Sequence, residues 1–159
     1  LRVLDSELMK LCLYKNFSTI QREDVLNFVS YSRQRNIFSV VDACINRKIK
    51  EALEFTEDLV FAGESPFGIS RLIERQVKLL IRAKNLKESG VGTAAVSKRL
   101  SLYGYPLQKT LEQEKSISFR ALSFIHDHIL ASEVRVRNGH MDELTSLKTL
   151  IVDIGTVSK

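Results

Sequence analysis

Four basic residues recur at three- and four-residue intervals within one short segment: Arg71, Arg75, Lys78 and Arg82. In an α-helix this spacing places their side chains within roughly 60° of one another. A cationic row of this kind can bind anions, including the phosphates of nucleic acids. The solvated side of an ordinary amphipathic helix contains the same pattern. The sequence leaves both interpretations open, an anion-binding surface and a solvated helix face.

Positive charge is concentrated around this row. Residues 71–109 include nine basic residues and two acidic ones, so this segment is more positive than the whole chain, whose net charge is +5. Such an excess favours an anionic partner. Tyr103 and Tyr105 add rings that are compatible with single-strand contacts, although tyrosines beside a Gly-Pro turn more often pack within a fold. The candidate contacts to nucleic acid or to a partner protein are Arg71, Arg75, Lys78, Arg82, Lys98 and Arg99.

The sequence contains no pattern of residues that indicates catalysis or metal binding. His126 and His128 are two residues apart, so on a helix they point roughly 200° apart and cannot share a metal ion. The stretch Gly90-Val91-Gly92-Thr93 lacks the lysine and the loop length of a nucleotide-binding P-loop. We therefore predict a binding protein, not an enzyme, with no catalytic residue, no metal and no cofactor.

The composition is that of a small helical domain or a domain with an attached piece. The chain has 159 residues, of which 44% are hydrophobic and 27% charged. It has no run of apolar residues long enough to span a membrane and no secretion signal, so we expect a cytoplasmic protein. Cys12 and Cys44 match no metal or redox spacing and are predicted to be reduced thiols. Because the chain starts at Leu1 with apolar residues already at helical spacing, we expect it to be a piece of a longer polypeptide.

Hydrophobic periodicity predicts an all-α helical bundle with short connections. A break and a domain boundary are predicted in the polar stretch 31–36. Gly63 is predicted to end one helix, and Ser65 and Pro66 to begin the next, as N-cap and first helical residue. The predicted helices cover residues 5–14, 21–30, 37–45, 49–61, 66–84, 93–102 (capped by Thr93), 106–117, a long segment that ends at Asn138-Gly139, and 141–154.

Several motifs resemble those of a known family. Residues 4–14, 20–25 and 36–43 are similar to the lid end of the bacterial DNA polymerase III delta subunit, with its Asn/Asp-Glu-Leu-x-Lys-Leu, Ile-Thr-x-x-Asp-Val and Ile-Phe-x-Leu-Val-Asp-Ala patterns. Residues 63–66 and 75–76 resemble the family's Gly-Glu-x-Pro and Arg-Gln signatures. Tyr105-Pro106, Glu133 and 137–139 fit its His-Pro and Asp-x-x-x-Lys-x-Gly positions. The departures from the family pattern are Gln21, Gly68 and Lys148.

The resemblance implies a non-catalytic subunit of a DNA-directed DNA polymerase holoenzyme, a nucleotidyltransferase complex. Residues 1–33 would be the last helices of an AAA+ lid domain, and residues 34–159 the helical collar domain. The collar would bind the other clamp-loader subunits, gamma/tau and delta-prime. In full length such a subunit opens the sliding clamp for loading on primed DNA. An N-terminal domain outside this sequence would bind the clamp, and DNA is a further candidate partner.

A second hypothesis does not depend on the resemblance. The basic segment could belong to an independent helical protein that binds nucleic acid. That hypothesis predicts an affinity that falls steeply with salt, because each neutralised phosphate releases a counterion.

Overall fold

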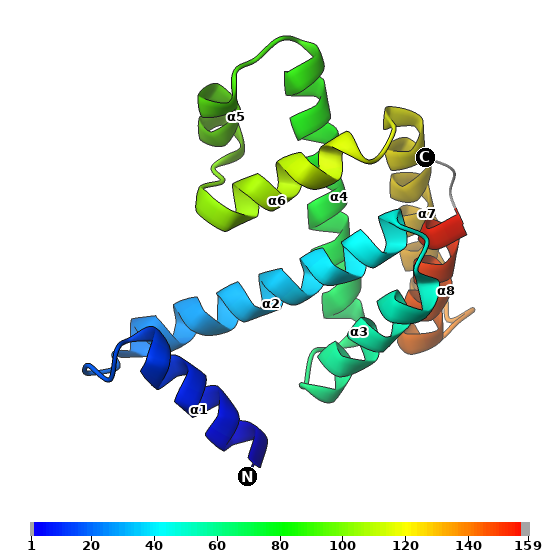
Figure 1. Ribbon diagram of the computed structural model, residues 1–159. Helices are drawn as coiled ribbons and strands as arrows, with labels where there is room; N and C mark the ends of the chain where they lie inside the picture. The colour runs from blue at the N-terminus through cyan, green and yellow to red at the C-terminus, as the bar shows by residue number, and fades with distance from the viewer. Residues whose placement is uncertain (1, 157–159) are drawn as a thin grey trace. The chain divides into compact units, whose positions relative to one another are not determined.

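Eight α-helices make up the computed structural model, which describes residues 2–156 and all of their side chains except those of residues 2–4, 6–7, 23 and 26–35. No strand occurs among the described residues, which confirms the predicted all-α class. Figure 1 shows the helices with their connections. The helices are α1 (Arg2–Tyr14), α2 (Arg22–Ile45), α3 (Ile49–Phe61), α4 (Pro66–Glu88), α5 (Thr93–Leu100), α6 (Gly104–Lys115), α7 (Phe119–Arg137) and α8 (Glu143–Thr156).

The predicted break at residues 31–36 is wrong. Helix α2 continues from Arg22 to Ile45 through this stretch. The stretch is polar, but it contains no Gly or Pro, and Arg and Gln are good helix formers. Low apolar content therefore marks a segment with little to bury, and it does not by itself end a helix.

The chain forms two compact units, Leu1–Arg35 and Asn36–Lys159, and the division falls inside α2. In the first unit, the turn after α1 leads into the capped start of α2. The carboxylate of Asp24 accepts a hydrogen bond from the backbone N–H of Gln21 at 2.9 Å and pairs with Lys15 at 3.0 Å. Both contacts lower the pKa of Asp24, and the hydrogen bond from the Gln21 backbone has the larger effect. Asp24 thus caps the start of α2.

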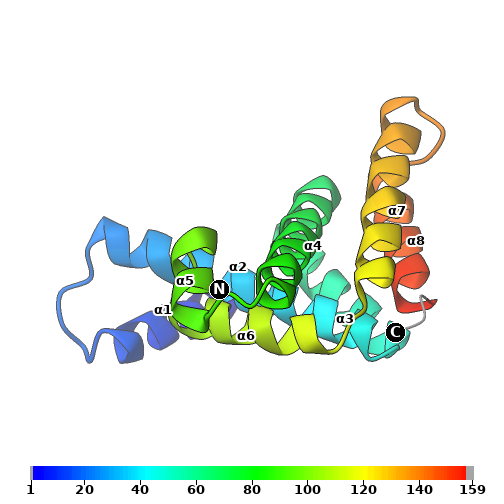
Figure 2. The same cartoon turned by 90° about the horizontal axis from the view of Figure 1, so that it is seen from above.

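Helix α4 is the centre of the second unit. It packs against α3, α5, α6, α7 and α8, and Figures 1 and 2 show it in green between α6 and the α7–α8 pair. Its inward residues Ile69, Ile73 and Leu80 are almost fully buried. They join a large core that draws on α2, α3, α7 and α8, including Val40, Leu59, Leu122, Ile129, Leu147 and Ile151.

A second, smaller core lies where α5 packs on α4. It consists of Leu79, Ala83, Val96, Leu100 and Leu102, with partly buried side chains from α6 against it. Because α5 contributes only eight residues, its position depends on this small cluster and on the contacts of its ends. The cluster holds α5 beside the C-terminal half of α4.

The corner between α3 and α4 forms as its residues predicted. Gly63 has a φ of +94°, a conformation in which glycine is not strained. Ser65 is the N-cap, and its hydroxyl accepts a hydrogen bond from the backbone N–H of Gly68 at 3.0 Å. Pro66 is the first helical residue. This corner sets where the basic row of α4 begins.

Three local predictions differ from the structure. Thr93 does not cap α5, because Gly92 occupies the N-cap position. Helix α6 begins at Gly104, two residues before Pro106, with the proline in its first turn, where a missing N–H is tolerated. Ile117 lies between α6 and α7, buried in the core, and not on the helix that precedes it.

Candidate functional site

The outer face of α4 carries the basic row that the sequence predicted. Arg71, Arg75, Lys78 and Arg82 are all exposed, whereas the opposite face of the helix lies in the core. The amphipathic placement is therefore confirmed. The structure also shows that the four cations have different surroundings, which the spacing alone could not show.

Two of the four cations, Arg71 and Lys78, are paired with acidic side chains within the molecule. Arg71 donates hydrogen bonds to Glu74 at 2.9 Å and to Glu133 of α7 at 3.1 Å, and Lys78 donates to the other carboxylate oxygen of Glu74. Glu74 is only 5% exposed. The hydrogen bond from Lys78 is the largest of the causes that lower the pKa of Glu74. The hydrogen bond to Glu133 is the largest of the causes that raise the pKa of Arg71. These charges connect α4 to α7, so they are engaged in the fold.

The remaining candidates lie on α4 and α5, and Arg82 of α4 contacts the end of α5. Among the described side chains, Arg75, Lys98 and Arg99 are exposed and form no ion pair. Arg82 also has no acidic partner there, and its guanidinium donates to the backbone carbonyl of Arg99 at 3.3 Å. That carbonyl lies at the end of α5, where a cation is favoured by the helix dipole. We call Arg75, Arg82, Lys98 and Arg99 the α4–α5 basic surface.

The two tyrosines near this surface differ from each other. Tyr103, just before α6, is 68% exposed. Tyr105 packs edge-on against Phe38, with the ring centroids 5.8 Å apart. Lys109, which the charge count included, is paired with Asp42 at 2.6 Å and with Glu112 at 3.5 Å. Of these two tyrosines, only Tyr103 therefore exposes most of its surface to solvent.

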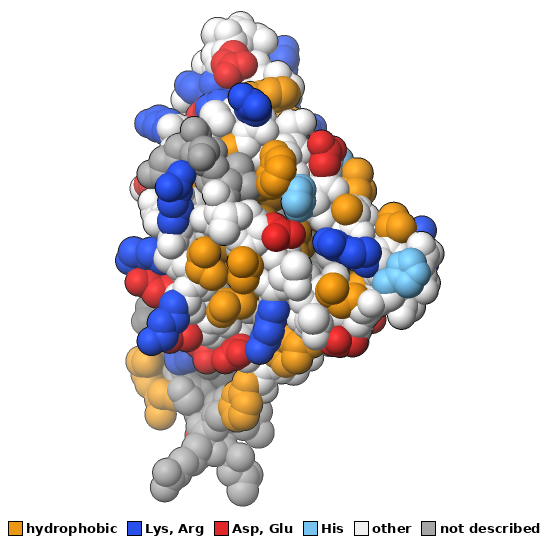
Figure 3. Space-filling view, turned by 90° about the vertical axis from the view of Figure 1, so that its right-hand side faces the viewer, with side chains coloured by type: hydrophobic (Ala, Val, Ile, Leu, Met, Phe, Trp, Pro, Cys, Tyr) orange, Lys and Arg blue, Asp and Glu red, His pale blue; other side chains and the backbone are white. Residues whose placement is uncertain are grey.

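A second exposed feature is an apolar row on α7. Phe119, Phe124, Leu130 and Val134 are each more than two-fifths exposed, with Val134 at 52%. Figure 3 shows hydrophobic patches among basic and acidic side chains on the side of the molecule that carries α7 and α8. An isolated exposed apolar residue is ordinary, but a row along one helix is typical of a surface that binds another protein.

No cluster of three or more metal-ligating side chains occurs among residues whose positions are given. His128 pairs with Asp153 at 3.2 Å and stacks on Phe124, which places it in a contact between α7 and α8. None of the described helices is both long and apolar enough to cross a bilayer.

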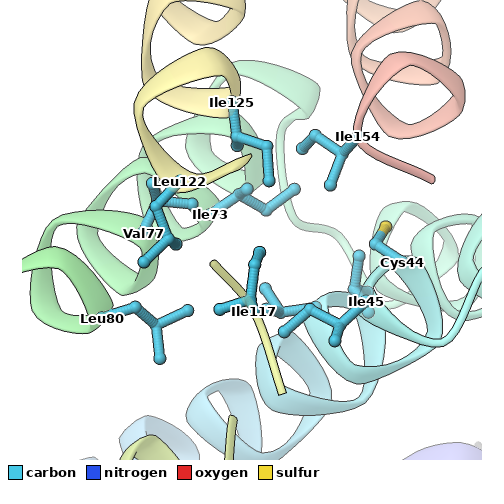
Figure 4. Close-up of a pocket in the computed structure, with 11 residues that line it drawn as sticks. Cys44, Ile45, Ile73, Val77, Leu80, Ile117, Leu122, Ile125 and Ile154 are labelled. Carbon is cyan, nitrogen blue, oxygen red and sulfur yellow. The ribbon is translucent and has the colours of Figure 1, made fainter. Parts of the chain in front are cut away.

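A small cavity in the large core is lined by apolar side chains and one thiol. Figure 4 shows Ile117, Ile125 and Ile154 around it, together with Cys44. Burial raises the pKa of the Cys44 thiol to about 12, so this cysteine stays protonated and unreactive at neutral pH. Both described cysteines are free, Cys44 buried and Cys12 partly exposed. The cavity is a packing space in the core, without polar groups to orient a ligand.

Comparison with known proteins identifies what this helical domain is similar to. A family model described as the C-terminal domain of the DNA polymerase III delta subunit matches residues 34–154. DNA polymerase III subunit delta of Bacillus subtilis is 26% identical over 149 residues, which are 93% of this chain and 43% of that protein. A solved structure of the Bacillus subtilis DNA clamp loader delta protein superimposes with a TM-score of 0.76 and 25% identity, over 96% of this chain and 45% of that one. The chain thus spans less than half the length of these relatives.

Proposed function

Because the chain belongs to the family of C-terminal domains of the DNA polymerase III delta subunit, we propose that it forms the collar part of a clamp-loader subunit. The domain binds neighbouring subunits of the complex. The longer protein, of which the relatives indicate that this chain is a part, opens the sliding clamp for loading on primed DNA. The observation that carries the proposal is the family match over residues 34–154, together with the structural superposition over nearly the whole chain.

We further propose that residues 1–33 are the end of an AAA+ lid domain and residues 34–159 the collar. The start of the family match at residue 34 supports this division. A compact unit that begins at Asn36 supports it as well. On this proposal the lid and the collar share the continuous helix α2.

The partners of the collar are the gamma/tau and delta-prime subunits of the same complex, in the bacterial cytoplasm. The sliding clamp is bound by an N-terminal domain that these 159 residues do not include. The chain itself contributes binding energy and no catalysis. The hypothesis of an independent nucleic-acid-binding protein is not favoured, since the family match and the superposition both point to the clamp loader.

The apolar row on α7 supports assembly through this helix. The centre of a protein interface is depleted of charge and rich in aromatic and aliphatic side chains. Phe119, Leu130 and Val134 supply such groups on a rigid helix whose other side is fixed in the core. We propose that this row contacts a neighbouring subunit of the clamp loader.

The proposal can be tested with the full-length protein, mixed with its cognate gamma/tau and delta-prime subunits and separated by size. We expect co-elution as one complex. Val134→Asp should weaken the complex by roughly tenfold or more, because a carboxylate would have to be desolvated at the contact. Val152→Asp is the matched control, the same change at an exposed valine of α8.

A helical protein that never co-elutes with the other subunits would contradict the collar role. Equal effects of the two valine substitutions, or none from either, would exclude the α7 row as the contact and leave the collar role intact.

A further inference from the structure

The solvent side of α3 combines exposed aromatic rings with acidic side chains. Phe61 is 87% exposed, more than any other large hydrophobic side chain that the structure describes, and Phe55 is 37% exposed. Glu54 and Asp58 are exposed on the same helix. At about 100° per residue, these four side chains lie within roughly 120° of one another, while the other side of α3 packs against α4 and α8. We call Glu54, Phe55, Asp58 and Phe61 the α3 outer face.

The two carboxylates of the α3 outer face lack close partners in the fold. The other acidic residues of α3 have close basic partners: Glu51 pairs with Lys48 at 3.0 Å, and Glu57 pairs with Lys148 at 2.7 Å. Glu54 has only an exposed pair with Lys50, which is 3.9 Å long. Asp58 forms no ion pair among the described side chains. Residues 51–70 contain five acidic residues and no basic one, so the chain supplies no nearby cation from this segment.

The position of Asp58 is unfavourable for the helix itself. Asp58 lies in the last turn of α3, which contains no basic residue. The carbonyl end of a helix carries partial negative charge, so a carboxylate there destabilises the helix. Glu54 lies four residues earlier, and like charges at this spacing repel each other. Stability therefore does not account for these two acids, whereas a bound cation would relieve both repulsions.

From this arrangement we infer that the α3 outer face binds a basic segment of another protein, with arginine or lysine side chains beside an aliphatic one. The cations would pair with Glu54 and Asp58, and the aliphatic group would pack on the ring of Phe61. An arginine also gains by stacking on an aromatic ring. The negative charge decides the class of partner, because it repels nucleic acids and acidic protein surfaces.

This contact uses a different helix from the α7 row, and it does not depend on the collar role. A second copy of this chain is the competing occupant, since its own α4–α5 basic surface has the complementary charge. Such an arrangement would make the full-length protein self-associate, which sizing over a range of concentrations detects.

The test measures binding of a fluorescein-labelled peptide of repeated Leu-Arg-Arg units to the full-length protein by anisotropy. Glu54→Lys with Asp58→Lys should weaken binding by roughly tenfold or more, because two attractions become repulsions. Both side chains are exposed, and a lysine at position 58 suits the end of the helix, so the variant should fold. Phe61→Ala should weaken binding about fivefold, whereas Phe61→Leu, which keeps an apolar side chain, should retain it.

The matched control for charge is Glu88→Lys with Asp127→Lys, which changes the net charge equally at exposed positions of α4 and α7. Its affinity for the peptide should remain within about twofold of the wild-type value. Phe119→Ala is the matched control for the ring, since Phe119 is an exposed phenylalanine of α7, and it should likewise leave peptide binding within about twofold.

A wild-type protein that does not bind the peptide would overturn the proposal. An equal loss in the Glu54/Asp58 and Glu88/Asp127 pairs would do so as well, and so would undiminished binding by Phe61→Ala, because either result would indicate unspecific charge attraction. Self-association that the Glu54/Asp58 pair abolishes would identify a second copy as the occupant, against the proposal. Co-elution of the same variants with the other clamp-loader subunits tests the collar role separately.

Discussion

Glu74 shows how much a single residue decides about the basic row. From the sequence it is merely the acid that interrupts four cations. In the structure it is buried, and it accepts hydrogen bonds from Arg71 and Lys78. A buried carboxylate is stable only with such partners. Two of the six predicted contact residues are thereby paired with acidic side chains, whereas the other four have no acidic partner among the described residues.

The first prediction concerns this carboxylate. Glu74→Gln should lower the free energy of unfolding by about 1–3 kcal/mol at neutral pH, because two charge-assisted hydrogen bonds are weakened at a buried site. Urea denaturation followed by circular dichroism measures the change. Glu54→Gln is the control: its pair with Lys50 is 3.9 Å long and exposed, so its effect should stay within about 0.5 kcal/mol.

The difference in unfolding free energy between the wild type and Glu74→Gln should also depend on pH, in a direction that the pKa of Glu74 defines. The folded-state pKa of Glu74 is lowered, so its stabilisation is complete above the ordinary glutamate value of about 4.3 and is lost as the pH falls through the lower folded value. The difference between wild type and Glu74→Gln should therefore shrink as the pH falls below about 4. A difference that grows towards acid would contradict the assigned contacts.

At the scale of elements, a buried amide fixes α6 against its neighbours. Gln113 accepts a hydrogen bond from Gln76 of α4 at 2.8 Å. It donates to the Phe38 carbonyl at 3.1 Å and to Asp42 at 2.7 Å, both near the end of α2. This arrangement joins three helices through one side chain that is 2% exposed. Helix α6 in turn contributes side chains that support the small core under α5.

We predict that Gln113→Leu destabilises the protein by about 1–3 kcal/mol, because it leaves buried polar groups without partners. Gln108→Leu on the same helix is the matched control, since Gln108 is exposed and bonds only to Glu112; its effect should be within about 0.5 kcal/mol. Thermal or urea unfolding of both variants provides the measurement. Similar stabilities for the two would show that the amide contributes nothing.

Helix α2 illustrates a limit of periodicity as a guide. Its apolar pattern fades between residues 31 and 36, which is why the sequence predicts an interruption there. A helix, however, continues through residues that tolerate helical backbone angles, because extending an existing helix costs much less than starting a new one. The helix boundaries at Gly63 and Ser65 were predictable because those residues act locally, through backbone conformation and capping.

On the scale of the whole molecule, the side chains that the structure describes contribute to the large and small cores from Ile37 onward. The unit Asn36–Lys159 therefore has the apolar content that an independent fold requires. This is the unit to which the family match largely corresponds, at residues 34–154.

We predict that a chain starting at residue 36 remains helical, unfolds cooperatively and, on the proposed function, binds the proposed partner subunits. Circular dichroism, thermal melting and sizing with gamma/tau and delta-prime test the three statements. The shortened chain should lose no more than the helical signal of the removed residues. A shortened chain without a cooperative unfolding transition would show that residues 1–35 are needed for folding. A folded chain without partner binding would place the contacts outside the collar.

Local and long-range interactions determine different features of this protein. The sequence alone determined the helical class, the inward stripe of Ile69, Ile73 and Leu80, and the capped corner at Ser65, because these depend on interactions within one or two helical turns. It also supplied the motifs that indicate the family. The tertiary structure decided which cations of the basic row bond to residues of other helices. The contacts of Arg71 with Glu133 and of Arg82 with Arg99 join residues far apart in the chain. They form only because α4 packs against α7 and α5, so a periodic sequence pattern cannot predict them.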